Sequence, residues 1–214
     1  MYAFQGCNKL NYNEHDNAKY LGNTINPYLV LIECKSTNIT NCNISEKTKV
    51  IASYAFVYCN SLTSISIPNS VTSIGRGAFP GGLKYTEYGR AKYLGNANNP
   101  YLALIHCEPV GTESCDINER TKIIADYAFY DCRPLGNVTI PNSVTSIGKY
   151  VFYNCNSLTS ITIPDSVINI QEYAFYNCNW LKTIYCRVKS KPSGWNSLWN
   201  GVDSARIVWG YTGN

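Results

Sequence analysis

Cysteines are the residues of this chain with the widest chemical capacity, because thiols can form disulfides, bind metals or act as nucleophiles. The chain has ten of them. Cys34 and Cys42 are eight residues apart, and so are Cys107 and Cys115. In an oxidising compartment a disulfide could join each pair. Cys42 and Cys115 also fit as small apolar residues of a core, so both interpretations stay open.

The remaining residue types give no catalytic or metal-binding pattern. His15 and His106 are the only histidines, and no CxxC or HxxxH spacing accompanies them, so a zinc site lacks a ligand set. The sequence contains no Gly-x-Ser-x-Gly elbow and no glycine-rich phosphate loop, and its 14 acidic residues are scattered. We therefore expect no catalytic residue, no metal and no other cofactor.

A short repeat, with a period of about 23 residues, organises the chain and sets where these cysteines lie. The repeat is anchored by Phe4, Phe56, Phe79, Phe129, Phe152 and Phe175. A cysteine follows three residues after most of these anchors, at Cys7, Cys59, Cys132, Cys155 and Cys178. Stacked repeats would align these cysteines along one ridge, where we expect small buried thiols.

Short strands are predicted inside each repeat. In Leu62-x-x-Ile65-x-Ile67, the alternation points the isoleucines inward and leaves Ser64 and Ser66 on a solvated face. One coil of this kind cannot bury its apolar residues alone, so successive coils must stack on one another. The pattern predicts a β-rich solenoid of 23-residue repeats, with short strands, turns and little helix.

Two insertions interrupt the period. Residues 17–32 resemble residues 90–105, so a larger unit of about 75 residues is duplicated. Each insertion has apolar runs on both sides of Gly-Asn-x-x-Asn-Pro, which is typical of strands joined by a longer loop. We predict β-hairpins that project from the solenoid at about residues 11–38 and 84–111.

The two ends of the chain depart from the repeat. Residues 180–214 gather Trp195, Trp199 and Trp209, which we expect to cap the last coil. Sugar binding by these tryptophans is the alternative. Met1 enters the repeat in its middle, so we expect a fragment of a longer chain, with residues 1–214 forming one solenoid.

Composition excludes several classes of partner. The 18 basic and 14 acidic residues are spread without a Lys/Arg run, so we expect no nucleic acid partner. Neither an apolar stretch of about 18 residues nor a charged-then-apolar leader after Met1 is present. We therefore expect no membrane span in this chain.

The motif Leu-x-x-Ile-x-Ile-Pro-x-Ser-Val-x-x-Ile-Gly-x-x-Ala-Phe-x-x-Cys, which begins at Leu62 and again at Leu135, closely resembles the BspA-like leucine-rich-repeat family of bacterial and protist surface proteins. The resemblance implies a leucine-rich-repeat solenoid at the cell surface or in secreted form, with relatives that adhere to host matrix proteins or cells. It carries over no catalytic residue. The chain departs from the family pattern at both insertions and at Gly82, where the cysteine is lost.

Two surfaces are candidates for binding a partner. The first is the outer strand face, formed by Ser64, Ser66, Asn137, Thr139, Ser160, Thr162, Thr183 and Tyr185. The second comprises the tyrosines of the insertions, of which Tyr28 and Tyr101 are equivalent. Polar strand residues can also serve only to keep a sheet soluble, and the tyrosines can simply pack on the solenoid.

These observations leave two functions to compare. The first is a non-enzymatic binding or adhesion module that recognises an extracellular protein or glycan through the strand face or the hairpins. The second is a structural spacer of a larger surface protein, with no ligand of its own. An enzyme is a third hypothesis without a supporting constellation.

Overall fold

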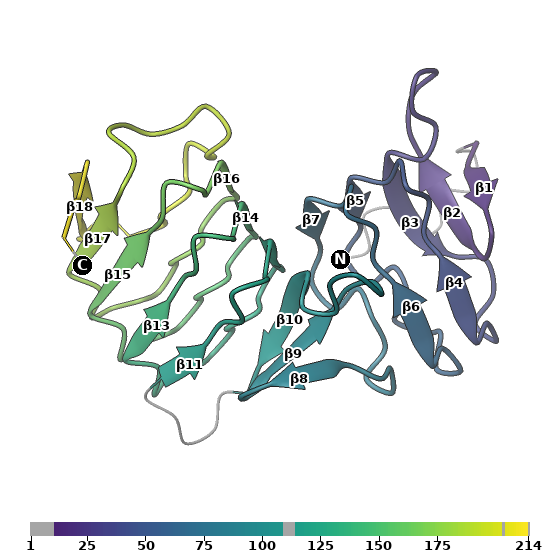
Figure 1. Ribbon diagram of the computed structural model, residues 1–214, viewed down its shortest axis with the longest axis horizontal. Helices are drawn as coiled ribbons and strands as arrows, with labels where there is room; N and C mark the ends of the chain where they lie inside the picture. Colours follow the sequence, from purple (N-terminus) through teal and green to yellow (C-terminus); the bar gives the residue numbers. More distant parts are fainter. Residues whose placement is uncertain (1–10, 109–113, 203, 214) are drawn as a thin grey trace. The chain divides into compact units, whose positions relative to one another are not determined.

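The computed structural model describes residues 11–108, 114–202 and 204–213, so Phe4 and Cys7 lie outside the described residues (Figure 1). Within these ranges the chain forms eighteen short strands and no helix. It follows that the described residues contain no helix able to cross a membrane. The chain divides into two compact units, Met1–Tyr85 with Leu94–Pro100 (unit 1) and Thr86–Tyr93 with Tyr101–Asn214 (unit 2).

Unit 1 contains two sheets. The five-stranded sheet has the order β1-β2-β3-β5-β7, and β4 pairs with β6 in a second sheet. These strands are β1 (Asn13–His15), β2 (Ala18–Leu21), β3 (Val30–Cys34), β4 (Asn41–Asn43), β5 (Val50–Ile51), β6 (Ser64–Ser66) and β7 (Ser73–Ile74). The β1–β2 and β2–β3 pairs are antiparallel, whereas β3, β5 and β7 run parallel.

Unit 2 contains three sheets. Their orders are β16-β14-β12-β10-β9-β8, β11-β13 and β15-β17-β18. The strands are β8 (Thr86–Tyr88), β9 (Ala91–Leu94), β10 (Ala103–Cys107), β11 (Ser114–Asp116), β12 (Ile123–Ile124), β13 (Asn137–Thr139), β14 (Ser146–Ile147), β15 (Ser160–Ile163), β16 (Asn169–Ile170), β17 (Thr183–Cys186) and β18 (Arg206–Trp209).

Parallel pairing in unit 2 joins each coil to the equivalent position of the next. Ile124 pairs with Ile147, and Ile147 with Ile170, so each partner lies one repeat further along the chain. The buried anchors Phe129, Phe152 and Phe175 stack in the same order, with ring centroids 5.0 and 5.2 Å apart. The predicted leucine-rich-repeat solenoid fold is therefore confirmed.

The Pro-x-Ser-Val motif has a structural role between coils. Ser143 Oγ donates a hydrogen bond of 2.7 Å to the carbonyl of Thr121 in the preceding coil, and Ser166 Oγ donates one of 2.8 Å to Val144. Each serine thereby satisfies a carbonyl that the short strands leave unpaired. The recurring serine at this position belongs to the solenoid and not to a binding surface.

Both insertions contain antiparallel strands around the same loop. A side chain cannot replace Gly22 or Gly95, because its Cβ would overlap the carbonyl oxygen of Asn26 or Asn99. In each segment the third strand continues into the parallel sheet of its unit, β3 beside β5 and β10 beside β12. Projecting hairpins with the bounds 11–38 and 84–111 stay a prediction, as does one solenoid over 1–214.

The tryptophans near the C-terminus belong to the core of unit 2. Trp195 and Trp199 are 2% and 3% exposed, and Trp199 meets the last stacked anchor, Phe175, edge to face at 6.1 Å. Trp195 Nε1 donates to the carbonyl of Val167. Buried indoles offer no face to a sugar, so this arrangement opposes sugar binding by these two rings. The cap bounds 180–214 remain a prediction.

Candidate functional site

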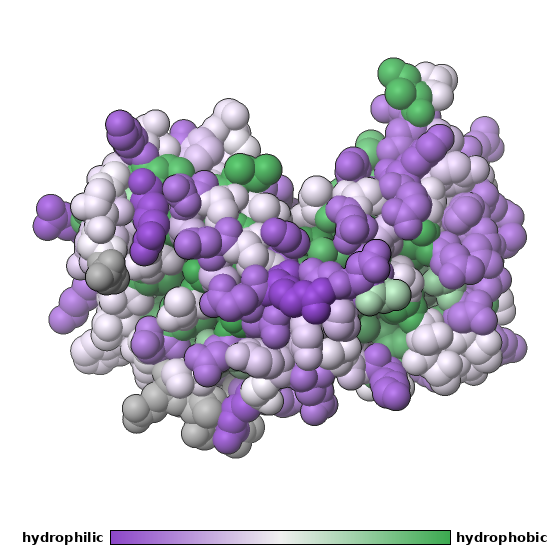
Figure 2. Space-filling view, in the orientation of Figure 1, coloured by the Kyte–Doolittle hydropathy of each residue, from purple (hydrophilic) through white to green (hydrophobic). Residues whose placement is uncertain are grey.

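A candidate surface site lies on the strand face of unit 2, over β13 and β15. Strand alternation buries Val138 and Ile161, which are 6% and 3% exposed. The same alternation turns outward the polar side chains of Asn137, Thr139, Ser160 and Thr162. In the view of Figure 2, hydrophilic and intermediate residues cover most of the visible surface, with small hydrophobic areas between them.

Register extends these polar side chains into rows across the coils. On one side, β11 pairs with β13 so that Ser114 lies beside Asn137. On the other side, β15 pairs with β17 so that Ser160 lies beside Thr183 and Thr162 beside Tyr185. The predicted residues of unit 2 therefore lie on one face, at equivalent positions of neighbouring coils.

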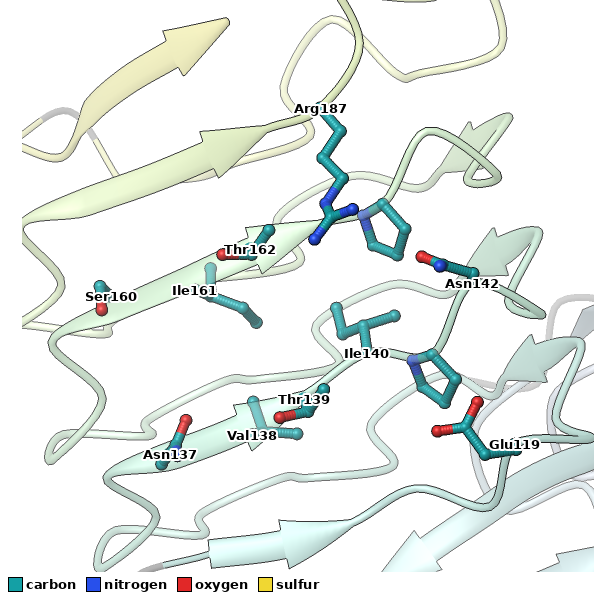
Figure 3. Close-up of a pocket in the computed structure, with 12 residues that line it drawn as sticks. Glu119, Asn137, Val138, Thr139, Ile140, Asn142, Ser160, Ile161, Thr162 and Arg187 are labelled. Atoms are coloured by element: carbon teal, nitrogen blue, oxygen red, sulfur yellow. The ribbon is translucent and has the colours of Figure 1, made fainter. Parts of the chain in front are cut away.

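A pocket of about 380 Å³ opens on this face where the strand pairing is interrupted (Figure 3). Strands β13 and β15 are successive in the solenoid, yet they belong to different sheets. The four predicted polar residues Asn137, Thr139, Ser160 and Thr162 line the pocket. The pocket is also lined by Glu119, Val138, Ile140, Pro141, Asn142, Ile161, Pro164 and Arg187. The sequence did not single out this border.

Charges of opposite sign stand at two sides of the pocket. In Figure 3, Arg187 extends from the end of β17 toward β15, while Glu119 lies at the opposite border beside the coil of β11. Arg187 is exposed and occupies the repeat position that holds Pro164 in the preceding coil. A guanidinium at this place can bind a carboxylate through two parallel hydrogen bonds.

The other predicted partner-binding residues lie elsewhere. Ser64 and Ser66 are exposed on β6 of unit 1, where β6 pairs with β4. Tyr28 and Tyr101 are partly buried, and each meets a fully buried tyrosine edge to face, Tyr20 at 5.5 Å and Tyr93 at 5.6 Å. Packing within the insertions accounts for these tyrosines, and binding by them stays a prediction.

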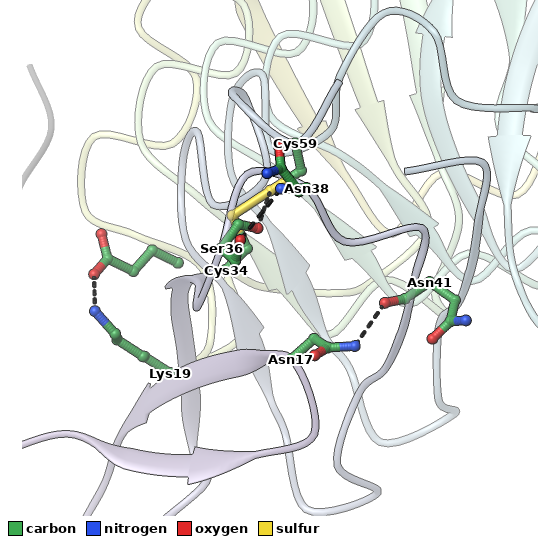
Figure 4. The surroundings of a disulfide bond; sticks show 8 residues. Asn17, Lys19, Cys34, Ser36, Asn38, Asn41 and Cys59 are labelled. Atoms are coloured by element: carbon green, nitrogen blue, oxygen red, sulfur yellow. Dashed lines mark hydrogen bonds and ion pairs between the residues drawn. A yellow bond between two sulfur atoms is a disulfide. The ribbon is translucent and has the colours of Figure 1, made fainter. Parts of the chain in front are cut away.

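The cysteine pairing differs from both predicted disulfides. Cys34 is bonded to Cys59, the ridge cysteine 25 residues later, instead of Cys42 (Figure 4). Cys42 is buried at a core position, as the alternative interpretation held. The strand register explains the outcome, because β4 places Cys42 beside Ile65 of β6.

The second predicted pair, Cys107 and Cys115, consists of free buried thiols. A hydrogen bond with Cys115, together with burial, raises the pKa of the Cys107 thiol. Cys132 lies nearby, and its Sγ is 3.6 Å from the carbonyl oxygen of Cys107. Three thiols therefore lie close together in the second copy of the duplicated segment. The first copy has the Cys34–Cys59 disulfide and the free Cys42 at the equivalent positions.

The cysteine ridge of unit 2 consists of buried thiols that are hydrogen-bonded to backbone carbonyls. Cys155 and Cys178 donate to the carbonyls of Phe129 and Phe152 at 3.2 and 2.9 Å. Burial raises the pKa of the Cys178 thiol to about 12 and raises that of Cys155 as well. Protonated buried thiols are poor nucleophiles and poor metal ligands. These cysteines fill the turns between coils.

Two rows of stacked tyrosines were missed by the sequence interpretation. The inner row is Tyr127, Tyr150 and Tyr173, and the outer row is Tyr130, Tyr153 and Tyr176. The inner row adopts positive φ angles of 61°, 50° and 57°, which bulky residues rarely accept. Stacking at 5.1 and 5.4 Å between its rings offsets this strain. The signal was a tyrosine two residues before and one residue after each of the anchors Phe129, Phe152 and Phe175.

No catalytic grouping emerges around the histidines. His15 contacts the rings of Tyr20 and Tyr28 in unit 1. Burial lowers the pKa of His106, whose Nε2 lies 3.9 Å from Glu108. In the ranges that the structure describes, no group of three or more His, Cys, Asp or Glu side chains could hold a metal ion.

Comparison with known proteins identifies the same repeat. The model of the BspA-type leucine-rich repeat region matches six times, over residues 1–88 and 107–201. A search of curated protein sequences found no match. Among solved structures, the pneumococcal vaccine antigen PcpA is similar with a TM-score of 0.51 and 16% identity, over 81% of this chain and 52% of the antigen. The chain thus spans about half the length of that antigen.

Two further solved structures have lower TM-scores. A leucine-rich-repeat protein from Bacteroides capillosus gives 0.49 at 24% identity, over 57% of this chain and 97% of that one. A leucine-rich cell-surface protein from Faecalibacterium prausnitzii gives 0.42 at 21% identity, over 82% and 60%.

Proposed function

The chain belongs to the BspA-type leucine-rich-repeat family, and from that premise we propose that it is a non-enzymatic module that binds a protein partner through the strand face of unit 2. The partner is an extracellular protein, and the module belongs to a surface or secreted protein. Support for this location comes from membership of the family, whose motif implies a protein of the cell surface.

The single observation that carries the proposal is the pocket over β13 and β15. Amide and hydroxyl groups from two coils line it, with apolar residues and prolines below them. Such a surface can hydrogen-bond an extended segment of a partner without a large loss of side-chain entropy, because short side chains have few rotamers to lose. Solenoids commonly bind extended partners on faces of this kind.

The test is biosensor binding of the whole chain to a panel of extracellular matrix proteins, with fibronectin, fibrinogen, laminin and collagen as probes. The variant Asn137→Tyr/Ser160→Tyr fills the pocket with side chains that stay on the surface. Its matched control, Ser64→Tyr/Ser66→Tyr, makes the same kind of change on β6 of unit 1. We expect saturable binding that the pocket variant weakens by more than about tenfold, while the control binds as the parent does.

Each other outcome has a definite meaning. Equal binding by parent and pocket variant would contradict the placement on unit 2. Loss of binding in the Ser64→Tyr/Ser66→Tyr control alone would show that the binding site lies on β6. Absence of binding to every protein of the panel would favour the structural spacer.

A further inference from the structure

The last two coils hold the entire net charge of the chain. Residues 173–214 contain five basic residues and one acidic residue, which gives +4, the formal charge of the whole sequence. The remainder, from Met1 to Glu172, contains thirteen of each sign and balances. The basic residues, although not consecutive in sequence, are therefore concentrated in one part of unit 2.

These basic side chains are exposed. They are Lys182, Arg187, Lys189, Lys191 and Arg206. Within the described ranges none of the five forms an ion pair, and Lys191 alone donates a side-chain hydrogen bond, to the carbonyl of Trp195. Elsewhere in unit 2, Lys149 pairs with Glu172 at 2.8 Å and Lys92 with Glu108 at 2.7 Å.

Strand register places three of the charges around the polar face. Arg206 begins β18 opposite Thr183, and its backbone amide donates to the carbonyl of Lys182. Lys182 and Arg206 therefore lie beside the start of β17. Arg187 follows the end of β17 and reaches into the pocket (Figure 3). Positive charge therefore flanks β17 at both ends.

The opposite side of the same face is acidic. Asp116 is exposed on β11, and Glu119 borders the pocket from the same coil. That coil is three repeats before the coil of Arg187, which corresponds to roughly 14 Å at the usual spacing of neighbouring strands. An extended segment of four or five residues covers such a distance. The face thus has basic residues at one end and carboxylates at the other, with hydroxyl and amide groups between them and the exposed Asp165 on the coil before that of Arg187.

From this arrangement we propose that the strand face of unit 2 binds an extended peptide segment of a partner protein that presents a carboxylate to Arg187 and a basic group to the side of Asp116 and Glu119. The inference rests on the proposed function and specifies the chemistry of its partner. A uniformly negative polymer, such as a nucleic acid or a sulfated glycan, fits poorly, because it would meet the acidic end as well. Pairing of the Arg187 guanidinium with the carboxylate of the peptide determines in which direction the peptide lies across the face.

The experiment uses the whole chain on a biosensor and three probes. The first probe is a twelve-residue peptide of Gly, Ser and Thr with two Asp at one end and two Lys at the other. The second replaces both Asp by Asn, and the third is a heparin oligosaccharide. The protein variants are Arg187→Glu and Arg187→Gln, with Lys47→Glu, an exposed lysine of unit 1, as the matched charge control.

We expect the first peptide to bind, and to bind about tenfold more weakly to either Arg187 variant and at high salt. The Asn peptide should bind as weakly as the first peptide does to Arg187→Gln, and Lys47→Glu should behave as the parent. Since all substituted side chains are exposed, equal melting temperatures verify that the variants fold.

Three results would overturn the inference. They are no binding of the first peptide, binding that is equal for parent and Arg187→Glu, and tighter binding of heparin than of the peptide. The matrix panel is measured on the same sensor surfaces. Binding of a panel protein that is insensitive to Arg187→Glu would refute the inference and leave the proposed function standing.

Discussion

The two copies of the duplicated segment of about 75 residues differ most in the bonding of their cysteines. Cys34, Cys42 and Cys59 recur with the same spacing in the second copy as Cys107, Cys115 and Cys132. In the first copy Cys34 and Cys59 form a disulfide, whereas in the second all three are free thiols. Identical spacing therefore does not determine the pairing. What differs is the surroundings, since Cys107 is buried and its thiol is hydrogen-bonded to Cys115, while Cys34 is only partly buried.

Charges around the same strands are exchanged between the copies. In the first, Lys19 pairs with Glu33 at 3.0 Å, next to Lys35 with Glu14. In the second, His106 stands in place of Glu33, and Lys92 pairs with Glu108 at 2.7 Å. Partly exposed pairs of this kind contribute little to stability, so the residues can be exchanged freely. The comparison indicates that differences in stability between the two copies come from buried groups and not from surface ion pairs.

The largest expected effect is loss of the disulfide in the first copy. Reduction should lower the free energy of unfolding of unit 1 by about 3 kcal/mol, because the bond closes a loop of roughly 25 residues. Hydrogen exchange of the amides of β3 and β5, followed by mass spectrometry, measures this in unit 1. The Cys34→Ala variant should exchange as fast as the reduced parent and should not respond to the reductant.

The second copy supplies the control for this prediction. Cys107→Ala should leave exchange in unit 1 unchanged, with or without reductant, since Cys107 forms no disulfide. If the reductant accelerates exchange in Cys34→Ala as much as in the parent, the stabilising bond is a different one. If it accelerates exchange in neither, the proposed difference between the copies disappears.

A pH response should distinguish the copies at Asp126, whose equivalent in the first copy is the neutral Ser53. Burial raises the pKa of Asp126 to about 6, partly opposed by a hydrogen bond from the amide of Lys149. Because the folded pKa is above the unfolded value of about 4, the carboxyl contributes stability that is fully present below pH 4 and lost as pH rises through about 6.

Asp126→Asn removes this titration. We expect the free energy of unfolding of the variant to exceed that of the parent by about 2 kcal/mol at pH 7.5, and this difference should shrink toward pH 4. Denaturation followed by tryptophan fluorescence reports on unit 2 alone, because all four tryptophans lie there. A constant difference from pH 4 to 7.5 would refute the assignment.

The smallest expected effect concerns a feature that both copies share. The hydroxyls of Thr48 and Thr121 are fully buried without a hydrogen-bond partner, whereas three other coils carry valine at this position. Thr121→Val should therefore stabilise unit 2 by about 1 kcal/mol, as measured by tryptophan fluorescence. The reverse change, Val144→Thr, should destabilise it by a similar amount. Destabilisation by Thr121→Val would show that the hydroxyl is satisfied.

The sequence predicts the coil well, because every repeat places apolar residues at the same positions and parallel stacking buries all of them together. It also predicts the outer polar residues of β13 and β15, since strand alternation determines them. The pocket border is harder to predict, because Arg187 and Glu119 belong to coils three repeats apart and the pocket lies where the pairing of β13 and β15 is interrupted. The disulfide is harder still, because Cys34 can reach more than one cysteine and only packing decides between them.

The bond between Cys34 and Cys59 has a consequence for a protein under mechanical load. When a chain is stretched from its ends, each residue released from the fold adds at most about 3.4 Å of length. A covalent loop of about 25 residues withholds roughly 80 Å from that extension. The first copy therefore contains a mechanical stop about one coil long, and the second copy, with its thiols free, would extend in full.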